Sequence, residues 1–252
     1  MDTKREIILA QSLTANDVRL LPHLPYLLQD LWELGSDPQE IAALLRHGAQ
    51  LDASSRVIDL GCGKGAVSIE VARQIGCTVI GHDLMESFIG TAREKAEELG
   101  VGHLCHFSVS DIVESVEHER NYDAVIFGAV GEVLGDPAEM LIQLRQVVRP
   151  SGYVIIDDAY STEGDQYLTQ EQWYSLFMNH GYDIVEEVVV NQDITAATNR
   201  FGQLAIERRV AELQLQFPDM ADLFAQYAAD QQSECDDLAS WLQGVTWLLR
   251  LT

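Results

Sequence analysis

The stretch from Val57 to Ala72, VIDLGCGKGAVSIEVA, constrains the fold of this chain more than any other. It opens with a short apolar run at 57–60, as expected of a parallel strand buried on both faces. Three glycines within 61–65 then indicate a sharp turn that a ligand can approach closely. Apolar residues continue through 67–72 in a pattern typical of a helix packed on the strand. This order predicts the first crossover of a doubly wound α/β sheet, which binds ligands beyond the carboxyl ends of its strands.

The glycine turn by itself fits two kinds of cofactor. Gly61, Gly63 and Ala66 match the dinucleotide pattern G-x-G-x-x-G/A, and an ordinary strand-to-helix turn is the simpler alternative. Asp83 follows at about the distance of a ribose-binding acid. However, the carboxylate of Asp59 would repel a pyrophosphate and attract a ligand that carries an ammonium and a sulfonium group. Asp59 therefore favours S-adenosylmethionine over NAD(P).

With this motif the chain resembles the class I S-adenosylmethionine-dependent methyltransferases, whose first motif is an acid, an apolar residue and then G-x-G-x-G. A second family feature is an Arg/Lys-Pro-Gly-Gly turn before the fifth strand. Here it reads Arg149-Pro150-Ser151-Gly152, with Ser151 in place of the first glycine. The resemblance implies a Rossmann-like, seven-stranded doubly wound sheet with an antiparallel last strand. It also implies S-adenosyl-L-methionine as the cofactor and S-adenosyl-L-homocysteine as its product.

Short apolar runs bounded by polar or turn residues predict the strands of this sheet. They cover residues 56–60, 78–82, 103–107, 123–127, 153–156, 182–190 and 245–251. Helical patterns separate them, including 87–100 and 168–180. In the second of these helices the side chains expected to face inward are Trp173, Leu176, Phe177 and Met178. Successive βα units imply a parallel sheet with right-handed crossovers.

We expect a single methyltransferase domain in four parts. They are an N-terminal helical cover (1–50), a cofactor-binding core (51–190), a helical cap insertion (191–244) and the last strand (245–252). The helices predicted in the cover and the insertion span 18–21, 26–34, 39–47, 205–215, 220–229 and 233–242. The insertion follows the carboxyl end of a strand, where substrate enters, so we interpret it as a lid, an oligomerisation surface or both.

The resemblance assigns the cofactor to residues that follow the first four strands. Asp83 would accept hydrogen bonds from the ribose hydroxyls, and Asp111 would accept one from the adenine amino group. A lone Asp after a strand is more often a turn residue or a helix cap, so the argument rests on both positions together. The predicted cofactor-binding residues are Asp59, Gly61, Cys62, Gly63, Gly65, Asp83, Leu84, Ser110, Asp111, Ile112 and Gly128.

The acceptor side of the site is less defined by sequence. Methyl transfer from a sulfonium is an in-line displacement, so positioning supplies most of the acceleration, and a base is needed only for a protonated acceptor. The catalytic candidates are Glu132, in the loop that borders the transferred methyl in the family, and Tyr160. With Tyr26 and Asp158 they form the predicted substrate-binding set, and a surface or capping role is the alternative for each.

Charge and loop composition favour a small-molecule acceptor. The formal net charge is −24, which would repel nucleic acid and an anionic membrane surface. The loop 127–130, Phe-Gly-Ala-Val, also lacks the Asn/Asp-Pro-Pro-aromatic tetrad of methyltransferases that act on nucleobase amines or glutamine side chains. We expect a small-molecule substrate, no nucleic-acid or membrane partner, and a possible homodimer.

The remaining chemistry of the chain predicts a cytoplasmic protein without a metal. Cys62, Cys77, Cys105 and Cys235 form no C-x-x-C pair, as expected in a reducing compartment. No secretion signal, membrane span or metal-ligand spacing is expected. Two other functions stay open: an NAD(P)-binding oxidoreductase, and a non-catalytic partner subunit that keeps the cofactor pocket.

Overall fold

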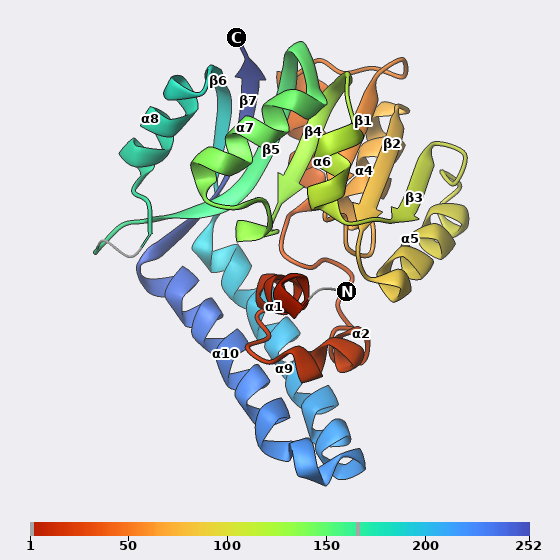
Figure 1. The fold of residues 1–252 in the computed structure, drawn as a ribbon, viewed down its shortest axis with the longest axis vertical. Coiled ribbons are helices and arrows are strands. Elements are labelled where there is room, and N and C mark those ends of the chain that lie inside the picture. Colours follow the sequence, from red (N-terminus) through yellow and green to blue (C-terminus); the bar gives the residue numbers. More distant parts are fainter. Residues whose placement is uncertain (1–2, 165–166) are drawn as a thin grey trace. The chain divides into compact units, whose positions relative to one another are not determined.

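The computed structural model describes residues 3–164 and 167–252 of the 252-residue chain, and these residues form two compact units (Figure 1). The helical unit comprises the described residues of Met1–Trp32, Ser161–Gly164 and Val190–Gln243. The sheet unit comprises those of Glu33–Tyr160, Asp165–Val189 and Gly244–Thr252. Residues 33–50, which the sequence groups with the N-terminal cover, thus belong to the sheet unit.

One seven-stranded sheet is found in the described residues, in the order β3-β2-β1-β4-β5-β7-β6. The strands are β1 (Arg56–Leu60), β2 (Thr78–Asp83), β3 (Cys105–Val109), β4 (Tyr122–Gly128), β5 (Val148–Ser161), β6 (Tyr182–Val189) and β7 (Leu242–Leu251). β1 pairs in parallel with β2 and β4, whereas β7 is antiparallel to β6. The predicted Rossmann-like fold is confirmed. Its strand order reverses between β1 and β4, so ligands are expected at the carboxyl ends of these two strands.

Helices connect the strands of the sheet unit, and several of them begin at a residue whose side chain accepts a hydrogen bond from the first turn. They are α3 (Pro38–Ala43), η2 (Leu44–Gly48), α4 (Ala66–Ile75), α5 (Glu86–Glu98), α6 (Ile112–His118), η3 (Glu132–Leu134), α7 (Pro137–Val147) and α8 (Gln170–Asn179). The carboxylate of Asp136 accepts from the backbone N–H of Glu139, and the Glu139 side chain accepts from Asp136 N–H in return. Such a capping box satisfies two backbone donors at the start of α7.

The helical unit contains α1 (Thr3–Ser12), η1 (Val18–His23), α2 (Leu24–Leu27), α9 (Gln192–Gln216), η4 (Pro218–Met220) and α10 (Ala221–Ser240). α9 and α10 are long helices that run side by side as a hairpin (Figure 1). At the start of η1, the side chain of Asp17 accepts from Arg19 N–H, which caps the helix.

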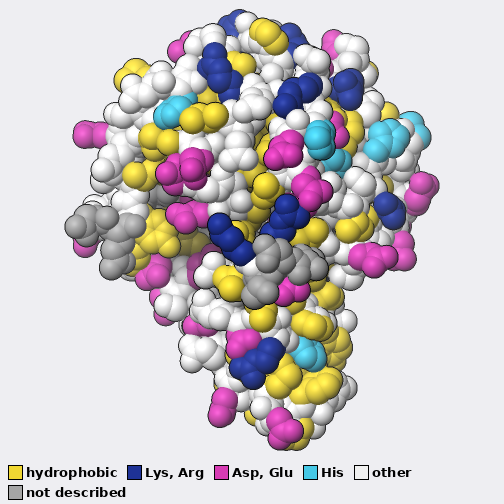
Figure 2. All heavy atoms as spheres, in the orientation of Figure 1, with side chains coloured by type: hydrophobic (Ala, Val, Ile, Leu, Met, Phe, Trp, Pro, Cys, Tyr) yellow, Lys and Arg dark blue, Asp and Glu magenta, His cyan; other side chains and the backbone are white. Residues whose placement is uncertain are grey.

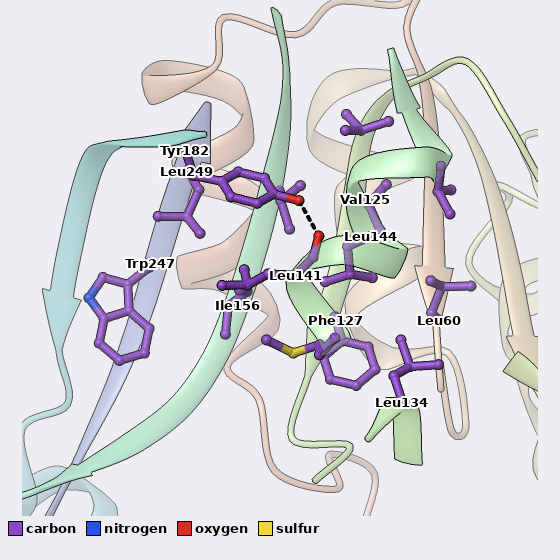
Figure 3. Packing of buried hydrophobic residues seen from close by; sticks show 14 of the residues in the cluster. Leu60, Val125, Phe127, Leu134, Leu141, Leu144, Ile156, Tyr182, Trp247 and Leu249 are labelled. Carbon is purple, nitrogen blue, oxygen red and sulfur yellow. Dashed lines mark hydrogen bonds between the residues drawn. The ribbon is translucent and has the colours of Figure 1, made fainter. Parts of the chain in front are cut away.

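The main apolar core lies where α7 and α8 pack on β4, β5 and β7. Figure 3 shows its residues from α7 and the strands. Phe177 and Trp247 are fully buried, and their rings meet edge to face at 5.2 Å. The hydroxyl of Tyr182 donates to the carbonyl of Leu141 at 2.8 Å, so this buried phenol has a partner (Figure 3). This packing fixes the strands whose ends carry the candidate site.

Several predicted elements are wrong in extent. The helix expected over 26–34 ends at Leu27. Turns follow it, and they lead out of the helical unit at Trp32. The last two helices predicted in the insertion are one continuous helix, α10, and α9 begins thirteen residues before the predicted start, at 192 instead of 205. Met178 was expected to face inward but is 72% exposed, because α8 turns Trp173 and Phe177 toward the core.

Strand β5 is longer than the sequence indicates at both ends. The expected turn at 149–152 is a bulge inside the strand: Val148 and Tyr153 both pair with β4, and the register shifts between them. At the other end, Asp158 and Tyr160 were expected after the strand but lie within it, beyond its last pair with β4 at Asp157. β5 has a second neighbour in the sheet, β7, which comes from much later in the chain. A local sequence pattern therefore could not show that the strand continues beyond Asp157.

Candidate functional site

The glycine turn joins β1 to α4 at the carboxyl end of the sheet. The N–H groups of Gly61 and Cys62 both donate to the carbonyl of His82, at 2.8 and 3.0 Å, which ties the turn to β2. Gly61, Gly63 and Gly65 have φ angles of +82°, +52° and +83°, where a side chain is strained. A Cβ on Gly61 would also lie 2.7 Å from a methyl of Val130. The backbone path therefore requires the glycines that the motif supplies.

The carboxylate of Asp83 links three loops at this edge. One of its oxygens accepts from Gly63 N–H and the other from Met85 N–H, both at 2.8 Å. Its backbone carbonyl accepts from Ser110 N–H at 3.0 Å, which brings the end of β3 alongside. Burial raises the pKa of Asp83 from its usual value. The side chains of Leu84 and Ser110 beside it are half-buried.

Asp59 lies in β1 and is buried, with 4% of its surface exposed. The hydroxyl of Ser68, in the first turn of α4, donates to it at 2.6 Å. Burial raises the pKa of Asp59 to about 7, and the charge of Asp83 adds to the shift. A buried carboxylate of this kind is stabilised in its charged form by a nearby cation. Sequence reasoning missed Ser68, although its place nine residues after Asp59, on the helix expected to pack on the strand, was a usable signal.

Asp111 has the helix-capping role that was its simpler alternative. Its side chain accepts from Val113 N–H at 2.9 Å at the start of α6. Ile112 is buried, and the hydroxyls of Ser110 and Ser115 lie 3.1 Å apart. The loop after β3 is thus ordered by its own side chains, and the adenine contact of Asp111 stays a prediction.

Carboxylates gather at the ends of β4 and β5. Gly128 ends β4, and the next N–H, of Ala129, donates to the carbonyl of Asp157 at 3.0 Å. Burial raises the pKa of Asp157 and of Asp158 to about 6. The charge of Glu132, an exposed residue at the start of η3, adds to the shift of Asp158. The structure thus places Glu132 close enough to Asp158 for its charge to raise the pKa of Asp158. It adds Asp157, which sequence reasoning did not select.

Tyr160 lies near an anion that sequence reasoning also missed. The carboxylate of Glu187 on β6 accepts from the hydroxyl of Tyr174 at 2.7 Å and from the indole N–H of Trp247 at 2.6 Å. Burial and the charge of Glu187 raise the pKa of Tyr160. Tyr160 is therefore better suited to donate a hydrogen bond than to accept a proton.

Tyr26 belongs to the helical unit, whereas Glu132, Asp158 and Tyr160 belong to the sheet unit. Its hydroxyl donates to Glu212 at 2.5 Å, and the guanidinium of Arg209 lies 5.2 Å from its ring centroid. These contacts give Tyr26 a structural role within that unit. Its part in substrate binding stays a prediction.

Two other features are absent from the part of the chain that the structure describes. No group of three or more His, Cys, Asp or Glu side chains is arranged to hold a metal ion. None of the helices within 3–164 and 167–252 combines the length and apolar character needed to cross a bilayer.

Comparison with known proteins decides the family. Residues 51–181, just over half of the chain, match the family model described as a methyltransferase domain. The chain belongs to the class I S-adenosylmethionine-dependent methyltransferases. This methyltransferase is 30% identical over 170 residues to the uncharacterized protein YjhP of Escherichia coli, covering 62% of this chain and 68% of YjhP. It is 26% identical over 119 residues to the 2-phytyl-1,4-naphtoquinone methyltransferase of Trichormus variabilis, covering 46% of this chain and about half (52%) of that protein.

Solved structures show the same fold. A methyltransferase from Thiobacillus denitrificans, in complex with S-adenosyl-L-homocysteine, superposes with a TM-score of 0.75 at 22% identity, over 91% of this chain and 98% of that one. The structure of YjhP gives the same TM-score at 21% identity, over 90% and 100%.

The residues of this methyltransferase fit S-adenosylmethionine as its cofactor. The turn at Gly61 and Gly63 brings bare backbone to the sheet edge, and Asp59 supplies a buried negative charge for the ligand's cationic groups.

Proposed function

We propose that this methyltransferase transfers the methyl group of S-adenosylmethionine to a small-molecule acceptor. The observation that carries the proposal is Asp59, a buried carboxylate beside a glycine turn at the carboxyl end of the central strand. Its raised pKa marks an anion whose own protein surroundings do not fully stabilise it. A bound ammonium or sulfonium would supply that stabilisation, whereas a pyrophosphate would worsen it.

The donor in this proposal contacts the ends of β1 to β4. Asp83 is the acceptor for the ribose hydroxyls. Each carboxylate oxygen has two lone-pair directions, so its bonds to Gly63 and Met85 leave acceptor capacity. The other proposed contacts are Gly61, Cys62, Gly65, Leu84, Ser110, Asp111, Ile112 and Gly128.

The acceptor in this proposal lies near Glu132 and Asp158. A pKa of about 6 makes the Asp158 carboxylate a suitable proton acceptor near neutral pH, where it is ionised and still basic. Glu132 reinforces that basicity through its charge. Tyr160 supplies a hydrogen-bond donor to orient the substrate. These groups suit an acceptor whose hydroxyl or ammonium loses a proton during transfer.

Two observations support a small acceptor: the net charge of the chain and the names of its relatives. A net charge of −24 opposes nucleic acid as a substrate. The relatives named as naphtoquinone and ubiquinone methyltransferases support a small organic acceptor. We further propose the cytoplasm as the compartment, since all four cysteines are free thiols, three of them buried.

Calorimetry on the purified chain tests the donor. We expect S-adenosylmethionine and S-adenosylhomocysteine to bind and NAD(P) not to bind. Binding of NAD(P) instead, or no binding of either donor form at millimolar concentration, would overturn the proposal. Release of S-adenosylhomocysteine across a panel of small hydroxyl and amine compounds then tests transfer. The Asp158→Asn variant should lose turnover but keep cofactor affinity, because it keeps the shape of the side chain and removes the base.

A further inference from the structure

Helix α9 presents two faces that are already packed within the helical unit. Gln203, Ile206, Val210 and Leu213 are buried on the side that faces α10, and Gln203 donates to the carbonyl of Ala228. A second face packs on residues 26–31: Arg209 binds the carboxylate of Asp30 at 2.6 and 2.8 Å, and Glu212 accepts from Tyr26. These contacts account for the position of α9 in its own unit.

A third face of α9 is exposed and carries a regular stripe that is apolar at every position except Arg208. Its residues recur with steps of four and three, the a/d spacing of a coiled-coil seam. They are Ala197, Phe201, Leu204, Arg208, Ala211 and Leu215. Phe201, Leu204 and Leu215 are 64%, 59% and 84% exposed. We call this set the α9 stripe, and it extends about 27 Å along the helix.

The α9 stripe lies nearly opposite the face that packs on α10. Leu204 precedes the buried Ile206 by two residues, and two residues turn a helix by about 200°. α9 is thus apolar on two opposite sides. Helices of that kind are normally buried between two layers, because one apolar side is otherwise left in water.

We propose that the α9 stripe pairs in antiparallel orientation with the α9 stripe of a second copy of this chain. The sizes of its side chains are self-complementary about a two-fold axis at residue 206. Phe201 then faces the partner's Ala211, and Leu215 faces the partner's Ala197. Both of these pairs set a large side chain against a small one, which is what close packing of two helices requires. Such a contact is isologous and closes as a dimer.

Charge favours the same partner and the same orientation. A parallel pair would place Arg208 against the partner's Arg208, whereas the antiparallel pair sets it on the partner's Leu204. The guanidinium of Arg208 stays bound to Asp30 of its own chain, at 2.7 Å, and the aliphatic part of the side chain covers the partner's Leu204. Two cations facing each other in a seam are destabilising, so the antiparallel pair is preferred.

The helix segment that carries the α9 stripe is less acidic than the chain as a whole. The whole chain has a net charge of −24, and Figure 2 shows Asp and Glu side chains spread over the visible face. Within 197–215 the charged residues are three Arg (200, 208 and 209) and two Glu (207 and 212), which gives +3 − 2 = +1, and Asp30, which binds Arg208 and Arg209, brings the sum to 0. A second copy that docks here avoids most of the acidic surface.

Analytical ultracentrifugation of the full chain tests the pairing. We expect a dimer, and we expect Phe201→Glu and Leu215→Glu each to raise its Kd at least about tenfold, because a charge would be buried twice in every dimer. Met178→Glu is the matched control, since Met178 is a 72% exposed apolar residue on α8, and it should leave the Kd unchanged. A monomer at every soluble concentration would overturn the proposal, as would a dimer that Phe201→Glu and Leu215→Glu leave intact.

Disulfide cross-linking in a Cys235→Ser background tests the orientation. The double variant Phe201→Cys with Ala211→Cys should form a covalent dimer on oxidation, and Phe201→Cys alone should not. Cross-linking by Phe201→Cys alone would indicate a parallel pair and refute the register. Because the α9 stripe is exposed, each variant should keep its helical circular dichroism. Binding of S-adenosylhomocysteine, measured on the same samples, reports on the methyltransferase function separately from the dimer.

Discussion

Lowering the pH from about 8 to about 6 should weaken the binding of S-adenosylhomocysteine about tenfold, because binding requires the charged form of Asp59. Burial raises the pKa of this carboxyl to about 7. The ammonium of the ligand favours the ionised carboxylate, so a proton must leave Asp59 before or during binding.

The size of the effect follows from the fraction of Asp59 that is ionised. With a pKa of about 7, roughly one molecule in eleven is ionised at pH 6 and roughly ten in eleven at pH 8. The contribution of Asp59 to folding stability changes with pH in the opposite direction to its contribution to binding. The folded, cofactor-free chain holds this proton more tightly than the unfolded chain does. The contribution of Asp59 to stability is therefore present below its unfolded pKa of about 4 and is lost as the pH rises toward 7.

Titration calorimetry across this pH range measures the affinity directly. Repeating it in two buffers of different ionisation enthalpy counts the protons released on binding. We expect nearly one proton released at pH 6 and almost none at pH 8. Asp59→Asn is the matched control: it keeps an acceptor for Ser68, should bind more weakly at pH 8, and should show little dependence on pH. A wild-type affinity that is flat between these pH values, with no proton released, would refute the reasoning.

Three further substitutions test the site and the core. Asp83→Ala removes the acceptor of Gly63 N–H and of the proposed ribose, so calorimetry should show a loss of roughly 1–3 kcal/mol in cofactor binding, and an unchanged affinity would move the ribose elsewhere. Gly61→Ala places a Cβ 2.7 Å from Val130 at a positive φ, so both affinity and melting temperature should fall. Adding Val130→Ala should restore part of each, and no recovery would contradict the steric explanation. Phe177→Ala should lower the free energy of unfolding by about 3–5 kcal/mol in urea titrations, and a loss below about 1 kcal/mol would show that the core collapses around the cavity.

The centre of the fold was readable from sequence because its signals are local. β1 was predicted with its observed bounds, since Val57, Ile58 and Leu60 lead directly into a glycine turn. By contrast, the extension of β5 through Asp158 depends on β7, which is far away in sequence. Polar residues in a strand are stabilised there by a neighbour that no local pattern reveals.

The candidate site divides in the same way. The glycine turn and Asp83 could be located from sequence because a turn between parallel strands demands particular residue types, and their contact with a cofactor stays a prediction. The partners of these groups were not found, since Ser68 meets Asp59 only after α4 has packed on the sheet. Glu187 was missed for a similar reason: its donors Tyr174 and Trp247 come from a separate helix and strand. Sequence reasoning identified the backbone of the site better than its side-chain network.

The register of β6 with β7 has a consequence for how this protein could diverge. Val189 and Val245 are paired residues, so the whole stretch from 190 to 244 departs from and returns to neighbouring points on the sheet. Ladder hydrogen bonds keep those two points together whatever lies between them. Evolution, or a protein engineer, is thus free to shorten, extend or exchange the intervening helices as a cassette while the strands that carry the proposed methyl-donor site keep their places.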